Sequence, residues 1–118
     1  MCYCDQDKSF ESCCQPYLDG VKNAPDAVSL MRSRYSAFVT SNKDYLLSTW
    51  HPQHAPTDLT FDEDQNWLGL KVLQWSSDDQ QAEVKFIARY KIHGKAHKLE
   101  EHSVFCYISG RWYYLHAK

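Results

Sequence analysis

Four of the five cysteines of this 118-residue chain lie within its first fourteen residues, and this crowding limits how the N-terminus can fold. Their spacing is C-x-C-x8-C-C, and the fifth cysteine, Cys106, lies far away. Four thiolates are the donor set of a closed tetrahedral zinc site. No histidine precedes His51, so an all-cysteine shell is the only local choice. We therefore predict a structural Zn²⁺ site formed by Cys2, Cys4, Cys13 and Cys14.

Three alternatives to zinc stay open for these thiols. Disulfides between the two pairs would need an oxidising compartment, and a bond between adjacent Cys13 and Cys14 would be strained. A redox relay would normally use C-x-x-C spacing, which is absent here. The thiols could also be inert. Within the zinc interpretation a structural site is favoured, because four protein ligands leave no open position for water. The metal would then hold together a tail too short to bury a core of its own.

Size, charge and hydropathy narrow the class of protein. The length predicts one domain with a short appendage. The formal net charge is -2 and the sequence pI about 6.3, which argues against nucleic-acid binding. No apolar run approaches the ~20 residues of a membrane helix, and no signal-peptide pattern is visible. We predict a cytoplasmic protein without a membrane span.

Two helices are predicted in the first half of the chain. Residues 27–40 carry apolar residues at helical spacing, and Asp26 is the predicted cap. Ser41 or Asn42 would cap a second helix over 43–50. That helix must end near His51, because Pro52 pushes its predecessor out of helical angles. Residues 52–66 form a polar loop.

The second half of the chain predicts strands. Residues 67–75, 82–92, 97–108 and 111–117 alternate or are rich in β-formers, with Gly94 and Ser109-Gly110 at turns. Two helices followed by an antiparallel meander indicate an α+β fold. We predict a knuckle and connector over 1–24 and a second domain over 25–118.

Several stretches together resemble a known family. "CYCDQDKSFESCCQPYLDG" is similar to the SEC-C zinc motif, which also ends the SecA translocation ATPase. After it, "LMRSRYSAFV", "DYLLSTWHP", "WLGLKV", "VKFIARY", "LEEHSVF" and "GRWYYL" resemble, in order, the YchJ-like family of bacterial SEC-C proteins. The resemblance implies a zinc-binding N-terminus on a cone-shaped, nuclear transport factor 2-like (cystatin-like) domain of undefined activity. In that fold two or three helices pack on a curved antiparallel sheet.

The resemblance also carries one departure and some expectations about partners. SEC-C motifs usually have Gly-Ser-Gly where this chain has Asp5-Gln6-Asp7, although Asp tolerates the positive φ of such a turn better than most residues. Because the similar element of SecA contacts a protein, the knuckle is expected to dock a protein partner. Cone-shaped folds commonly dimerise through the open sheet face, so a homodimer is a further expectation. Catalysis is not expected.

Strand parity places two polar residues on an otherwise apolar face. On 97–108, Glu101 and Ser103 share a side with Leu99, Phe105 and Tyr107. Arg34 interrupts the apolar stripe of the first helix in the same way. A buried lone charge is costly, and these two could satisfy each other. We predict an Arg34–Glu101 ion pair inside the cone.

The pair is interpreted first as structural and second as part of a pocket for a small polar or anionic ligand. A salt bridge to Arg34 would lower the pKa of Glu101, which disfavours a general-base role. The candidate pocket residues are Arg34, Tyr35, Trp50, His51, Tyr90, Glu101, Ser103, Phe105 and Trp112.

Other features have simple structural interpretations. His51 is expected to cap the helix end, the basic residues of 91–98 to form a solvated hairpin tip, and Cys106 to be a packed thiol. The acidic run 62–64 lacks calcium-loop spacing. No phosphate-loop, dinucleotide or H-E-x-x-H motif occurs.

Overall fold

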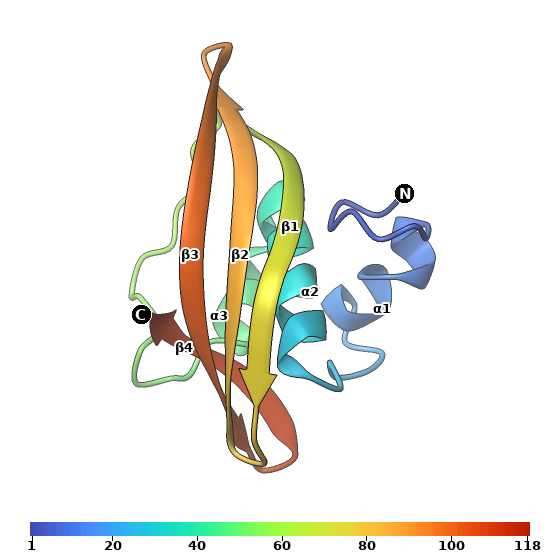
Figure 1. Cartoon of the computed structure of the whole chain (residues 1–118), viewed down its shortest axis with the longest axis vertical. Coiled ribbons are helices and arrows are strands. Elements are labelled where there is room, and N and C mark those ends of the chain that lie inside the picture. The colour runs from blue at the N-terminus through green and yellow to red at the C-terminus, as the bar shows by residue number, and fades with distance from the viewer.

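A computed structural model describes all of residues 1–118, and its core is an antiparallel sheet with helices on one face (Figure 1). The sheet is a meander in the order β1-β2-β3-β4. The elements are η1 (Phe10–Ser12), α1 (Gln15–Leu18), α2 (Ala27–Val39), α3 (Lys43–Ser48), β1 (Gln65–Ser77), β2 (Gln81–Ile92), β3 (Lys95–Ile108) and β4 (Arg111–Ala117). The predicted α+β fold class is therefore confirmed. The two short helices before α2 were not predicted.

Both predicted helix caps form. The carboxylate of Asp26 accepts a hydrogen bond from the backbone N–H of Ser29 at 2.7 Å, and the side chain of Asn42 accepts one from Tyr45 at 3.1 Å. Each satisfies an N–H that the first helical turn leaves without a partner. Helix α3 ends at Ser48, two residues earlier than predicted, and the hydroxyl of Thr49 donates to the carbonyl of Tyr45 at 2.7 Å.

Tight turns set the register of the last three strands. His93-Gly94 and Ser109-Gly110 all have positive φ, between 51° and 82°, which is the signature of two-residue type I′ hairpins. Such turns match the strand twist, so pairing continues up to the turn. This explains why β3 begins at Lys95, ahead of the predicted residue 97. The β2–β3 tip extends beyond the helices, and its residues 93–100 are exposed (Figure 1).

The sheet is curved by irregular pairing. Strand β1 changes register against β2 between Trp67 and Gly69 and between Val72 and Gln74. The extra residues, Leu68 and Leu73, are exposed. Bulges of this kind bend a strand and increase its twist. The bend wraps the sheet around α2, as Figure 1 shows.

One buried cluster joins the helices, the sheet and the N-terminal segment. Leu30 of α2, Leu46 of α3, Phe86 of β2 and Phe105 of β3 are all at most 4% exposed. Three N-terminal residues, Cys2, Cys4 and Cys14, belong to the same cluster. The division into 1–24 and 25–118 as separately folding parts stays a prediction. No helix is both long and apolar enough to cross a membrane.

Candidate metal centre

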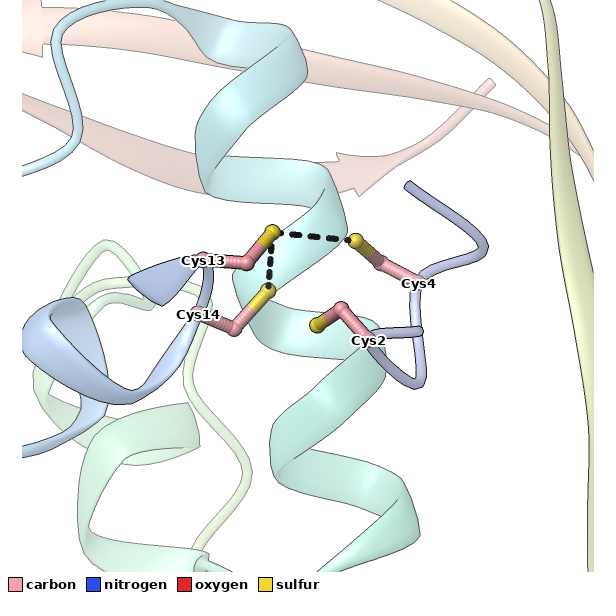
Figure 2. A group of neighbouring side chains, drawn as sticks. All are labelled: Cys2, Cys4, Cys13 and Cys14. Atoms are coloured by element: carbon pink, nitrogen blue, oxygen red, sulfur yellow. Dashed lines mark hydrogen bonds between the residues drawn. The ribbon is translucent and has the colours of Figure 1, made fainter. Parts of the chain in front are cut away.

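The four N-terminal cysteines converge on one point beside α2 (Figure 2). Their sulfur atoms all lie within 4.8 Å of one another. The Sγ atoms of Cys4 and Cys13 are 3.6 Å apart, and those of Cys13 and Cys14 are 3.9 Å apart. A tetrahedron with Zn–S bonds of about 2.3 Å has S···S edges of about 3.8 Å. These four residues could therefore hold a metal ion with little movement.

A tight turn presents the first two ligands. The backbone N–H of Asp5 donates to the carbonyl of Cys2 at 3.0 Å, and the N–H of Cys2 donates to the carbonyl of Gln6 at 3.2 Å. Asp5 has φ of 68°, the left-handed region that favours glycine and that Asp tolerates. The replacement of the usual glycine by Asp5 therefore leaves the turn intact.

Two consecutive helical turns present the other pair. The backbone N–H of Cys13 closes η1 on the carbonyl of Phe10 at 3.1 Å. Cys14 is the N-cap residue of α1, and its carbonyl accepts a hydrogen bond from the N–H of Tyr17 at 3.0 Å. Adjacent side chains at such a junction point toward the same sulfur cluster, as Figure 2 shows. No local rule identified these short helices, because helices of three and four residues are not stable by themselves.

Asp5 also ties the cysteine turn to the edge of the sheet. Its Oδ2 atom accepts a hydrogen bond from the backbone N–H of Leu70 in β1 at 2.9 Å. A Cβ atom added to Gly69 would lie only 2.8 Å from the same oxygen. Gly69 is thus the residue that lets the carboxylate approach the strand. Sequence analysis missed this contact, which joins residues 65 positions apart.

Helix α2 supports the cluster from the side. Arg32 donates from Nη1 to the carbonyl of Cys4 at 3.0 Å, and the Sγ of Cys2 lies 3.8 Å from the hydroxyl of Ser36. The Nε of Arg32 is buried without a hydrogen-bond partner. Four thiolates around a divalent ion would carry a net charge of about -2, so a guanidinium beside them is electrostatically favourable.

The thiols have unequal acidity. Hydrogen bonding from neighbouring thiols, that of Cys14 first, lowers the pKa of Cys4 to about 5. Burial raises the pKa of Cys13 to about 12. The pKa of Cys14 is also raised, first by its hydrogen bond to Cys4 and then by burial. Without a cation, Cys4 is therefore the thiol that loses its proton more readily than Cys13 or Cys14. A divalent cation would compensate the charge that keeps the other protons on.

The predicted Arg34–Glu101 ion pair does not form. Arg34 is 3% exposed, but its Nη1 donates to the carbonyl of Leu46 at 2.8 Å and to the hydroxyl of Thr49 at 2.7 Å. Its guanidinium lies 5.0 Å from the ring of Trp50 and 4.6 Å from that of Tyr114. Burial lowers the pKa of Arg34 to about 10, so it stays charged at neutral pH.

Glu101 has a local partner instead of the arginine. It is half-buried, and its Oε2 accepts a hydrogen bond from Ser103 at 2.8 Å, two residues along the same strand. The predicted pair was wrong for a physical reason. Residue alternation placed both charged side chains on the inner side, but it did not show that the carbonyl of Leu46 in α3 faces Arg34. Carbonyl, hydroxyl and ring faces can stabilise a guanidinium without a carboxylate.

The other candidate pocket residues do not form one group. Tyr35 and Tyr90 both pack on Trp67, with ring centroids 5.6 and 5.5 Å away. Phe105 is fully buried against Tyr114. Trp112 is buried and lines a cavity beside α3.

His51 is not the predicted helix cap. Its backbone N–H donates to the carbonyl of Tyr114 at 2.8 Å, and its ring Nδ1 accepts from the N–H of Gln53 at 3.1 Å. The ring therefore orders the following turn. Cys106 is half-buried, and this burial raises the pKa of its thiol.

Comparisons with known proteins agree with this geometry. A family model described as the middle NTF2-like domain of YchJ matches residues 26–117. A UPF0225 protein of Polaromonas sp. is 50% identical over 111 residues, covering 91% of this chain and 80% of that protein. A UPF0225 protein of Xanthomonas campestris is 46% identical over 121 residues, covering 99% and 93%.

Two solved structures share the fold. The solution structure of a SEC-C motif containing protein from Rhodopseudomonas palustris matches with a TM-score of 0.89 at 32% identity, over 99% of this chain and 96% of that one. A crystal structure of a SEC-C motif containing protein from Psychrobacter arcticus matches with a TM-score of 0.79 at 27% identity, over 98% and 75%. The predicted NTF2-like fold and the SEC-C resemblance are confirmed.

Proposed function

This chain belongs to the YchJ-like UPF0225 family, and we propose that it is a non-enzymatic protein-docking module organised by a structural zinc ion. The observation that carries the proposal is the convergence of four mostly buried thiols at the spacing of a tetrahedral site. The proposed partner contacts the N-terminal segment that the metal holds in place.

Zinc is the proposed ion because the donors are all sulfur. Soft thiolate ligands in a tetrahedral arrangement select Zn²⁺ over Mg²⁺ or Ca²⁺, which prefer oxygen. Cys2, Cys4 and Cys14 are at most 3% exposed, so the site is shielded from solvent. Thiolate ligands must stay reduced, and we propose a reducing cytosol as the compartment.

Exposed apolar side chains next to the cluster support docking. Met1 is 80% exposed, and Tyr3, which sits between two cysteine ligands, is 46% exposed. The ring of Tyr3 is held against Phe10 at a centroid distance of 5.0 Å. Rigid aromatic residues of this kind anchor protein interfaces. The segment forms one side of the molecule, on the far side of β1 and α2 from β3 (Figure 1).

Two features favour binding over catalysis. A metal held by four cysteines has no open position for a substrate or an activated water. The buried Arg34, which a small-ligand receptor or enzyme would use, already donates to the carbonyl of Leu46 and the hydroxyl of Thr49. The alternative, a small-ligand receptor or enzyme with an internal site at Arg34, is therefore less well supported.

Native mass spectrometry with elemental analysis tests the metal. We expect one zinc per chain in the wild-type protein and none in a Cys13→Ser, Cys14→Ser double variant. Cys106→Ser is the matched control, because it removes a thiol outside the cluster. A double variant that kept a full zinc equivalent would refute the assignment.

Docking is tested separately by quantitative capture of a cross-linked partner from the bacterial lysate. We expect Tyr3→Ser to reduce capture at unchanged zinc content. Tyr107→Ser, which removes a similarly exposed tyrosine of β3, should leave capture intact. Equal capture by both variants would show that the knuckle is not the docking surface.

A further inference from the structure

A cavity lies where the connector after the cysteines meets α3 and the start of β4. Its volume is about 380 Å³. Small-molecule sites commonly begin at about 300 Å³. Connector residues 17–20 and 22–24 form one wall, and α3 together with Arg111 and Trp112 forms another. The cavity is distinct from the sulfur cluster.

The floor of the cavity includes buried apolar side chains. Leu30, Tyr45 and Trp112 are between 2% and 7% exposed and belong to the core cluster. The hydroxyl of Tyr45 is 2.6 Å from that of Ser33, so this polar atom already has a partner. The floor therefore offers an apolar surface of defined shape.

The rim carries two charges of each sign. Asp19 and Asp44 supply carboxylates, while Lys22 and Arg111 supply cations. None of these four belongs to an ion pair of the structure, and neither carboxylate accepts a side-chain hydrogen bond. The sum of their charges is zero. An anion or a cation alone would meet repulsion from half of this rim.

Aromatic rings, not carboxylates, position the two cations. The Nζ of Lys22 lies 5.2 Å from the centroid of the Tyr17 ring, and the guanidinium of Arg111 lies 5.5 Å from that of Tyr113. A cation held over a ring keeps its hydrogen-bond donors free. Arginine in particular binds a carboxylate through two parallel hydrogen bonds.

We propose that this cavity binds a small zwitterion, an amino acid or dipeptide with an apolar side chain. The ligand's carboxylate lies at Arg111, its ammonium at Asp44, and its side chain against Leu30 and Trp112. Because Asp44 is exposed, binding is weak, in the millimolar range. This site does not depend on the proposed docking role of the knuckle.

The test is a titration of the isotope-labelled full chain with the dipeptide L-alanyl-L-leucine, followed by NMR. We expect saturable shifts at the Trp112 indole and the Ala24 amide. Capping the dipeptide as its N-acetyl or its C-terminal amide form should weaken binding at least fivefold. Absence of saturable shifts at these residues, or capped forms that bind as tightly as the free dipeptide, would overturn the proposal.

Variants assign the two ends of the ligand. We expect Arg111→Gln to weaken binding about fivefold and to abolish discrimination against the amide, and Asp44→Asn to abolish discrimination against the N-acetyl form. Arg89→Gln and Asp79→Asn are matched controls, because both residues are exposed and lie outside the cavity. Arg111→Lys keeps the charge and guards against a folding defect. Equal losses in the control variants would contradict the assignment.

Discussion

The contact between Asp5 and the edge of β1 predicts a non-additive pair of mutations. A methyl group at Gly69 would lie 2.8 Å from Oδ2 of Asp5, the end of a flexible side chain. The Gly69→Ala protein can therefore relieve the clash by moving the carboxylate away, at the cost of its hydrogen bond to Leu70. That bond is worth about 1 kcal/mol, because Asp5 is exposed.

The same bond is lost in Asp5→Ala, together with the tolerance of Asp for φ of 68°. We expect Asp5→Ala to lower the free energy of unfolding by about 2 kcal/mol, of which about 1 kcal/mol is the hydrogen bond. Asp5→Asn keeps an acceptor and tolerates the same φ, so it should cost less than about 0.5 kcal/mol. Asp7→Ala is the control, since its side chain accepts no hydrogen bond in the same loop.

Urea unfolding at a fixed zinc concentration measures the double-mutant cycle. Gly69→Ala should cost about 1 kcal/mol in the wild-type chain and almost nothing in the Asp5→Ala chain, a coupling of about 1 kcal/mol. The corresponding change in melting temperature is about 4 °C. Additive costs would refute the claim that Gly69 is small because Asp5 occupies its side of the strand.

Three further predictions concern the buried arginine, a surface carboxylate and the metal. Arg34→Met should lower the free energy of unfolding by about 3 kcal/mol, because it strips the buried Leu46 carbonyl of its donor. Glu101→Gln should change the free energy of unfolding by less than about 0.5 kcal/mol, since no ion pair is lost. A larger cost for Glu101→Gln than for Arg34→Met in urea unfolding would instead support an Arg34–Glu101 ion pair. Lys118 first, and then His102, holds the pKa of Glu83 below its usual value. A carboxyl group with a lowered pKa in the folded state adds stability above its unfolded pKa, and this stability is lost as the pH falls through the folded pKa. Glu83→Gln should therefore destabilise the protein more at pH 7 than in acid. An equal cost at both pH values would contradict the linkage. Removing zinc with a chelator should lower the melting temperature of the wild-type protein and leave the Cys13→Ser, Cys14→Ser variant unchanged in calorimetry.

Local rules predicted the elements of the domain well because they act over a few residues. Asp26 and Asn42 cap their helices through the N–H three residues on. Two-residue turns with Gly94 and Gly110 define the last hairpins. The same rules missed η1 and α1, which are too short to be stable by themselves and depend on tertiary contacts, such as those of α1 with α2.

The candidate site shows the same division. The cysteine spacing predicted the ligand set, since ligands close in sequence need only two turns to meet. Parity assigned Arg34 and Glu101 to the inner side, yet the arginine's partners come from the end of α3 and from β4. Side-chain partners that lie on other elements depend on the angles at which those elements pack.

The sequence by itself determined the local structural elements: a four-cysteine cluster, two capped helices and a four-stranded meander. Each follows from spacing, capping or alternation within about ten residues. Only the tertiary structure decided that Asp5 reaches Leu70, that Arg34 is stabilised by carbonyls and rings, and that a charged cavity opens beside α3. The residues in these contacts lie far apart in the sequence and meet only because bulges and helix packing bring their elements together. No local pattern in the chain predicts which of them will be in contact.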